Sequence, residues 1–199
     1  LRAKLAVHET VPAAHILCGN GAADLIFRLV WAAKPRTALL HAPTFAEYEE
    51  ALRQTDTECS FYEMQPDLQI REDILDEMDS SLDVMFVCNP NNPTGILTPR
   101  SLLDQILKKA EVCGILLVLD ECFLDFLPDG DRWTAKPLLH EDQNLIIFKA
   151  FTKLYGMAGV RLGYCLSADA ALLEKMRNAG QPWAVSSLAQ AAGVAALKE

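Results

Sequence analysis

A lysine and an arginine eight residues apart are the strongest candidates for chemistry in this sequence. Lys153 and Arg161 lie in a segment that contains two glycines and an alanine, at 152–161. Desolvation and a nearby like charge lower the pKa of a lysine, which can then attack a carbonyl group as a Schiff-base nucleophile. Lys149 is a rival, although its place at the end of an apolar run predicts a side chain that extends to solvent.

Asp120 is a second candidate because it directly follows an apolar run at 115–119 and is itself followed by Glu121. A carboxylate that is partly desolvated at such a point needs a cationic partner, such as an arginine or a protonated ring nitrogen. Helix capping or a structural ion pair is the alternative interpretation of this acidic pair.

Two glycine- or proline-containing loops complete the set. The turn Cys-Gly-Asn-Gly-Ala-Ala-Asp at 18–24 leads into a helical pattern, and a helix amino terminus with close backbone approach favours a phosphate. It is not the dinucleotide-binding pattern, because Asp24 stands where the third glycine belongs. The loop Asn-Pro-Asn-Asn-Pro-Thr-Gly at 89–95 is stiff and presents amides, either to a ligand or to its own turns.

Together these segments offer a phosphate cradle, an orienting amide, a buried acid and a loop lysine followed by an arginine. Such groups can hold a phosphorylated aldehyde with a cationic ring and bind it covalently. The sequence therefore predicts pyridoxal 5′-phosphate as the cofactor. A plain turn at 18–24 and an α/β domain that binds a nucleotide there are the alternatives.

The elements that must position these residues alternate along the chain. Strands are expected at 37–41, 59–63, 84–88, 115–119, 145–149 and 162–166, and helices at 22–33, 46–54, 71–78, 99–113 and 169–179. This alternation predicts an α/β fold with a mostly parallel sheet that helices cover on both faces. Ligands bind such sheets where strands end. The segment 127–139 is expected to be a surface excursion.

Composition narrows the class of protein. The chain has 199 residues, 51% of them hydrophobic, and a net charge of −9, which disfavours nucleic acid and anionic membranes as partners. No apolar run reaches the roughly 18–20 residues of a membrane span. Six cysteines without a CxxC pair predict buried, reduced thiols in a cytoplasmic protein and no metal site. The chain starts at Leu1 and has helical patterns at 1–7 and 186–199, so a fragment of a longer chain is expected.

The sequence resembles the fold-type-I pyridoxal-phosphate enzymes, in the class II aminotransferase branch that contains histidinol-phosphate aminotransferase, over essentially all 199 residues. The segment 89–95 matches the family's NPxNPTG, Asp120-Glu121 matches its DE pair, and 152–161 matches [ST]-K-x(7)-R. The resemblance implies a three-layer α/β/α large domain of the aspartate aminotransferase type at 1–199. The amino-terminal arm and the carboxy-terminal small domain of the relatives would be absent.

The resemblance also implies roles for single residues. Lys153 should bond to the cofactor and carry protons, Asp120 should pair with the ring nitrogen, and Asn92 should bond to the phenolic oxygen. Phe45 should stack on the ring, with Tyr48 as a second candidate. The phosphate should be held by the Gly21 turn, the backbone of Ala22 and Ala23, Thr152 and Arg161.

Phe123 departs from the aminotransferase pattern, which usually has a tyrosine three residues after the aspartate. One hydrogen bond to the cofactor should therefore be missing. The segments 43–48, 120–126 and 181–185 are more similar to threonine-phosphate decarboxylases of cobalamin biosynthesis. This implies a lyase that converts L-threonine O-3-phosphate to aminopropanol phosphate. A histidinol-phosphate or related aminotransferase is the alternative, and a sensor domain of a DNA-binding regulator is a third.

The resemblance has consequences for partners and activity. It implies a small phosphorylated amino acid as substrate and a homodimer for the full-length protein. Since the residues that grip the substrate lie outside this chain in relatives, the isolated 199-residue chain is expected to bind the cofactor weakly and to turn over poorly or not at all.

Overall fold

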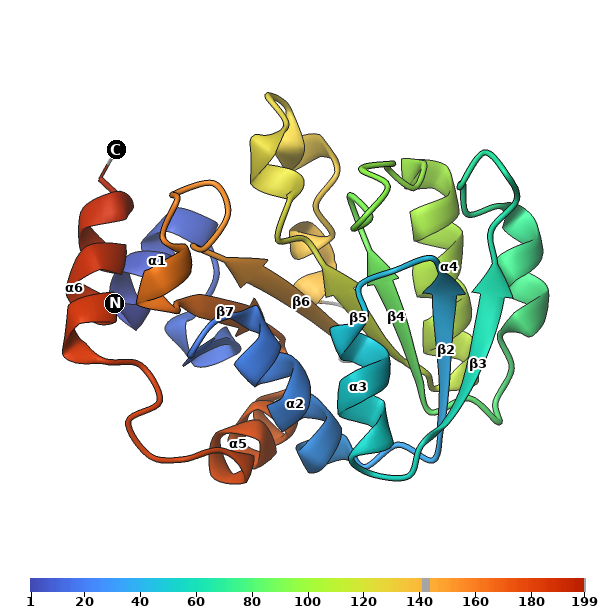
Figure 1. Ribbon diagram of the computed structural model, residues 1–199, viewed down its shortest axis with the longest axis horizontal. Coiled ribbons are helices and arrows are strands. Elements are labelled where there is room, and N and C mark those ends of the chain that lie inside the picture. Colours follow the sequence, from blue (N-terminus) through green and yellow to red (C-terminus); the bar gives the residue numbers. More distant parts are fainter. Residues whose placement is uncertain (141–143, 199) are drawn as a thin grey trace.

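Seven strands form one sheet in the computed structural model, which describes residues 1–140 and 144–198 (Figure 1). In chain order they are β1 (Ile16–Gly19), β2 (Thr37–Ala42), β3 (Glu58–Glu63), β4 (Val84–Cys88), β5 (Leu116–Asp120), β6 (Leu145–Ala150) and β7 (Gly163–Leu166). Across the sheet the order is β1-β7-β6-β5-β4-β2-β3. Strands β2 to β6 pair in parallel, and β7 is antiparallel to both of its neighbours. The predicted mostly parallel sheet is confirmed.

Helices cover both faces of this sheet. They are α1 (Arg2–Glu9), α2 (Ala22–Ala33), α3 (Glu47–Arg53), α4 (Arg100–Cys113), α5 (Ala170–Ala179) and α6 (Ser187–Ala196). One apolar core joins the sheet to α2, α3 and α5, and a second core joins its other face to α1, α4 and α6. Side chains alternate between the faces, so Ile146 and Phe148 of β6 enter one core and Ile147 enters the other. The three-layer architecture is confirmed.

The six predicted strands are present within two residues of their expected bounds, whereas β1 was not predicted. It is only four residues long and pairs with β7, far along the chain, so no local pattern marks it. The prediction of an α-helix at 71–78 is wrong, because Glu72–Glu77 forms 3₁₀ turns instead. This segment buries a single apolar side chain, Ile74, and lacks the apolar face that stabilises a short α-helix. The helical patterns at 1–7 and 186–199 are α1 and α6, with Glu199 outside the described residues.

The segment 127–139 folds back onto the core and is not simply a surface excursion. Ala135 and Leu139 within it are fully buried. Glu121 anchors it by accepting hydrogen bonds from the Thr134 hydroxyl (2.6 Å) and the Ala135 N–H (2.8 Å). A buried carboxylate needs such donors, and this segment supplies them.

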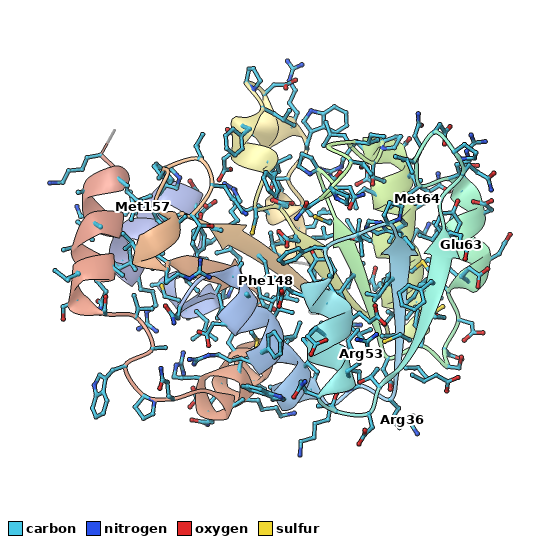
Figure 2. All side chains as sticks on the ribbon, in the orientation of Figure 1. Arg36, Arg53, Glu63, Met64, Phe148 and Met157 are labelled. Atoms are coloured by element: carbon cyan, nitrogen blue, oxygen red, sulfur yellow. The ribbon has the colours of Figure 1, made fainter. Side chains whose placement is uncertain are left out.

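The parallel strands direct their following loops to one edge of the sheet. Figure 2 shows Glu63 and Met64, at the carboxyl end of β3, at the opposite edge from Arg36, which precedes β2. The loops after β2, β4, β5 and β6 therefore meet at the edge where Glu63 and Met64 lie. This edge is where ligands bind in open α/β sheets.

Two further predictions concern thiols and membranes. All six cysteines are free, and Cys88, Cys122 and Cys165 are buried while the other three are half-buried. Within the described residues, no helix has the length and apolar character needed to cross a membrane.

Candidate active site

A cavity of about 310 Å³ lies at the carboxyl edge of the sheet. Its lining consists of Ala22, Ala23, Phe45, Glu47, Cys88, Asn92, Asp120, Cys122, Phe123, Ala150, Thr152, Lys153 and Arg161. These residues come from the last positions of β4, β5 and β6, from the segments that follow β1, β2, β4, β5 and β6, and from the segment that precedes β7. Because these strands are neighbours in the sheet, segments far apart in the sequence converge on one cavity.

The structure brings the predicted site residues together. Apart from Gly21 and the second ring candidate Tyr48, all of them line the cavity, and Gly21 lies directly beside it against Arg161. The roles assigned to them remain predictions. Four lining residues were not predicted: Glu47, Cys88, Cys122 and Ala150. Cys88 and Ala150 are the last residues of β4 and β6, a position that could have identified them.

The amino terminus of α2 forms a potential anion cradle. Gly21 precedes the helix with φ 88° and provides no side-chain cap, so the first N–H groups of the helix have no partner within it. A Cβ atom at Gly21 would lie 2.7 Å from Nη2 of Arg161, and one at Gly163 would lie 2.5 Å from the Ala22 nitrogen. Only glycines permit this close packing, which places a guanidinium beside the helix dipole.

Asp24 in the first turn of α2 does not oppose an anion there. Its carboxylate accepts the Asn20 N–H (2.8 Å) and the Nε–H of Arg28 (2.9 Å), whose side chain is 3% exposed. The ion pair neutralises the acid within the helix and leaves the cationic character of the cradle to Arg161.

Asp120 is the last residue of β5 and is 5% exposed. One carboxylate oxygen accepts the Cys122 N–H (2.9 Å), and the other accepts the hydroxyl of Tyr48 (2.7 Å). Tyr48 is fully buried and does not line the cavity, so the prediction that it could stack on a ligand is wrong. As a residue of α3, it packs under the cavity, while Phe45, in the preceding loop, faces into the cavity.

Glu121 and Lys149 lie on the other face of the sheet. Successive side chains of a strand point to opposite faces, so Glu121 points away from the side that Asp120 faces. Burial raises the pKa of the Glu121 carboxyl group. The prediction that the Lys149 side chain extends to solvent is wrong, since Lys149 is 5% exposed and its ammonium lies 2.7 Å from Asp125. Burial alone would lower the pKa of Lys149, but the carboxylates of Glu9, Asp125 and Glu121 outweigh it and raise that pKa. Lys149 is therefore an ion-paired ammonium, and it does not line this cavity.

Lys153 differs from Lys149 in its solvent exposure and in the cavity that it lines. It lies on an exposed loop and lines the cavity, where its ammonium is 5.0 Å from the centre of the Phe123 ring. This is within the range of a cation–π contact. Phe123 thus presents an aromatic face to the lysine.

The three asparagines of segment 89–95 have distinct contacts. Asn89 accepts the Thr98 N–H (2.8 Å), and the Asn91 amide donates to Thr94 (3.0 Å) and to the Pro43 carbonyl (3.1 Å). Asn92 lines the cavity. The loop is therefore fixed by two of its asparagines while the third is available to a ligand.

His41, at the end of β2, joins two of the site's loops. It is fully buried, and its Nε2 accepts the Cys88 N–H (3.2 Å), which requires an unprotonated Nε2. Burial lowers the pKa of His41 to about 4.

Protonation of His41 predicts a loss of stability in acid. The unfolded histidine takes up its proton near pH 6.5, whereas the folded one resists until about pH 4. The free energy of unfolding is therefore highest, as far as His41 is concerned, above pH 6.5. It falls by about 3 kcal/mol as the pH is lowered from 6.5 to 4. Urea unfolding of wild type and His41→Asn at several pH values in this range measures the pH dependence of the free energy of unfolding. The variant should have a shallower dependence, and equal slopes would contradict the assignment.

The fold and the site define a class of protein, the three-layer α/β proteins whose ligand cavity lies at the strand ends of an aspartate aminotransferase-like sheet. The sequence profile for aminotransferase class I and II matches residues 2–199, and the chain belongs to this family.

Two relatives illustrate this membership, and one solved structure illustrates the fold. The threonine-phosphate decarboxylase of Salmonella typhimurium is 38% identical over all of this chain and 55% of its own length. The histidinol-phosphate aminotransferase of Geobacillus sp. is 32% identical over all of this chain and 54% of its length. The crystal structure of the histidinol-phosphate aminotransferase from Clostridium acetobutylicum superposes with a TM-score of 0.91 at 24% identity, covering 99% of this chain and 58% of that one. The chain spans about half the length of these relatives.

Proposed function

We propose that this chain forms the pyridoxal-phosphate site of an enzyme. The observation that carries the proposal is the convergence of a lysine, a carboxylate and an uncapped helix amino terminus on one cavity of about 310 Å³. When bound, pyridoxal phosphate supplies an aldehyde that condenses with amines and a ring that withdraws electrons from the carbon attached to the amine.

The residues of the cavity fit this group. Arg161, Thr152 and the first N–H groups of α2 form a part of the lining that is suited to a phosphate. Asp120 has acceptor capacity left for a ring N–H. Phe45 and Phe123 offer apolar surfaces to a ring. Lys153 would supply the amine that holds the aldehyde, and it would carry protons at the same place.

For the reaction we propose decarboxylation of L-threonine O-3-phosphate to aminopropanol phosphate. The relative named threonine-phosphate decarboxylase, which is 38% identical over the whole chain, supports it. Phe123 supports it as well, because the chain lacks the hydroxyl expected of an aminotransferase at this position. The second candidate is transfer of an amino group from histidinol phosphate, which the 32% identity to a histidinol-phosphate aminotransferase favours.

Product analysis separates the two reactions. The intact gene product that contains this sequence would be supplied with pyridoxal phosphate and with carboxyl-labelled L-threonine O-3-phosphate. We expect labelled CO2 and aminopropanol phosphate, and no glutamate from histidinol phosphate and 2-oxoglutarate. Glutamate without CO2 would reverse the assignment. Neither product, from a protein that binds the cofactor, would contradict both substrates.

A further inference from the structure

Tyr48 makes a buried contact that the proposed chemistry does not yet use. Its hydroxyl donates to Asp120 at 2.7 Å across 72 positions of the sequence, and its side chain is fully buried. The other oxygen of the same carboxylate accepts the Cys122 N–H at 2.9 Å. The Asp120 carboxylate is therefore held at both oxygens, and its orientation is fixed.

The Tyr48 ring is itself held by two aromatic rings. It stacks on Phe86 of β4 with ring centres 4.9 Å apart, and the ring of Phe45 meets it edge-on at 5.5 Å. Phe86 is 1% exposed, so this packing leaves the hydroxyl little freedom. Tyr48 thus contacts two residues that are expected to meet the cofactor. Asp120 is expected at the ring nitrogen, and Phe45 is expected on the face of the ring.

The direction of the hydrogen bond is also fixed. Burial, and next the negative charge of Asp120, raise the pKa of the Tyr48 hydroxyl well above its ordinary value. Tyr48 therefore remains a donor and Asp120 an acceptor. A carboxylate offers about four acceptor positions, so Asp120 keeps some for a third donor in the cavity.

We infer that Tyr48 is a positioning residue, which holds Asp120 in the orientation that pairs with the cofactor's ring nitrogen. The inference rests on the proposed pyridoxal-phosphate site. It adds to that site a group, in α3, which never touches the ligand and acts through the aspartate.

The test compares two ligands on Tyr48→Phe, which removes one hydroxyl and keeps the ring. The ligands are pyridoxal phosphate and its 1-deaza analogue, in which carbon replaces the ring nitrogen. The measured quantity is the ratio of their dissociation constants. We expect wild type to prefer pyridoxal phosphate, and this preference to fall about tenfold in the variant, the size expected for loss of a hydrogen bond to a charged group. General loss of folded protein weakens both ligands and cancels from the ratio.

Tyr164→Phe is the matched control. Tyr164 in β7 is 4% exposed and donates to a buried carboxylate, that of Glu9, on the other face of the sheet. Its removal should affect stability and leave the ligand ratio unchanged. If both variants change the ratio equally, or if Tyr48→Phe leaves it at the wild-type value, the inference is overturned.

A measurement on the unmutated chain covers the case in which Tyr48→Phe does not fold. With fluorotyrosine at all four tyrosines, the ¹⁹F resonance of Tyr48 should shift on adding pyridoxal phosphate and much less on adding the analogue. Equal shifts would overturn the inference while leaving the cofactor site intact. These measurements use the intact gene product that contains this sequence. If that protein retains no pyridoxal phosphate at all, the proposed function fails, and the inference fails with it.

Discussion

Replacing Lys153 with alanine is expected to abolish covalent attachment of pyridoxal phosphate to this chain. Lys153 is the lysine that lines the cavity within the described residues, and its amine lies near the aromatic face of Phe123. Borohydride reduction converts an amine–aldehyde linkage into a stable bond, so peptide mass spectrometry can locate the modified lysine. In wild type we expect the label on the peptide that contains Lys153. In Lys153→Ala the signal should fall to the background of surface lysines, because no other lysine of the described residues lines the cavity.

Two other lysines provide the controls. Lys175 is exposed on α5, and Lys175→Ala should retain full labelling. Lys149 should remain unlabelled in every variant, because carboxylates surround its ammonium and raise its pKa. Labelling that survives in Lys153→Ala at the wild-type level would contradict the assignment of the nucleophile. The result also decides whether the 199-residue chain retains the cofactor without further segments.

Replacing Lys149 with methionine is expected to destabilise the fold by about 3–5 kcal/mol. The ammonium lies 2.7 Å from Asp125 and 3.8 Å from Glu9, which is 1% exposed and is also bonded by Lys136 (2.9 Å) and Tyr164. Burial alone would raise the pKa of Glu9, but Lys149, Tyr164 and Lys136 outweigh it and lower that pKa. Removal of Lys149 leaves a buried carboxylate with half of its cationic partners. Urea unfolding at neutral pH measures the loss.

Lys108→Met is the matched control, because Lys108 is exposed on α4 and has no comparable burial. Its effect should stay within about 0.5 kcal/mol. A Lys149→Met variant as stable as this control would show that the ion pairs contribute no net stability. The network joins α1, the loop after β5 and the end of β6, so its loss should also loosen the loop that carries Lys153.

Much of the site was predictable because the sequence places it at strand ends. Runs such as 84–88 and 145–148 are apolar throughout, as strands covered on both faces must be, and the segments after them carry polar side chains. The parallel sheet then brings Asn92, Asp120 and Lys153 to one edge without further information. Their types and order, together with the family's motif spacing, indicated the cofactor.

The side of the sheet that each residue faces could not be predicted with the same success. Asp120 lines the cavity while Glu121, its neighbour, accepts from Thr134 on the opposite face. Lys149 and Lys153 are four positions apart, and the solvent exposure expected of Lys149 is found at Lys153. In a strand, a shift of one residue reverses the direction of a side chain, so small errors in strand bounds decide such assignments.

The sequence by itself determined the order of β2 to β7 and of the α-helices, although not the 3₁₀ turns at Glu72–Glu77. It also determined the helix start at Asp169, which caps α5 through the Leu172 N–H (2.9 Å), and the set of polar residues near the strand ends. Each depends on neighbours within a few positions. Only the tertiary structure decided the pairing of β1 with β7, the burial of Lys149 beside Glu9 and the bond from Tyr48 to Asp120. These contacts join residues 72 to 150 positions apart, and packing around a shared core, rather than any local pattern, selects them.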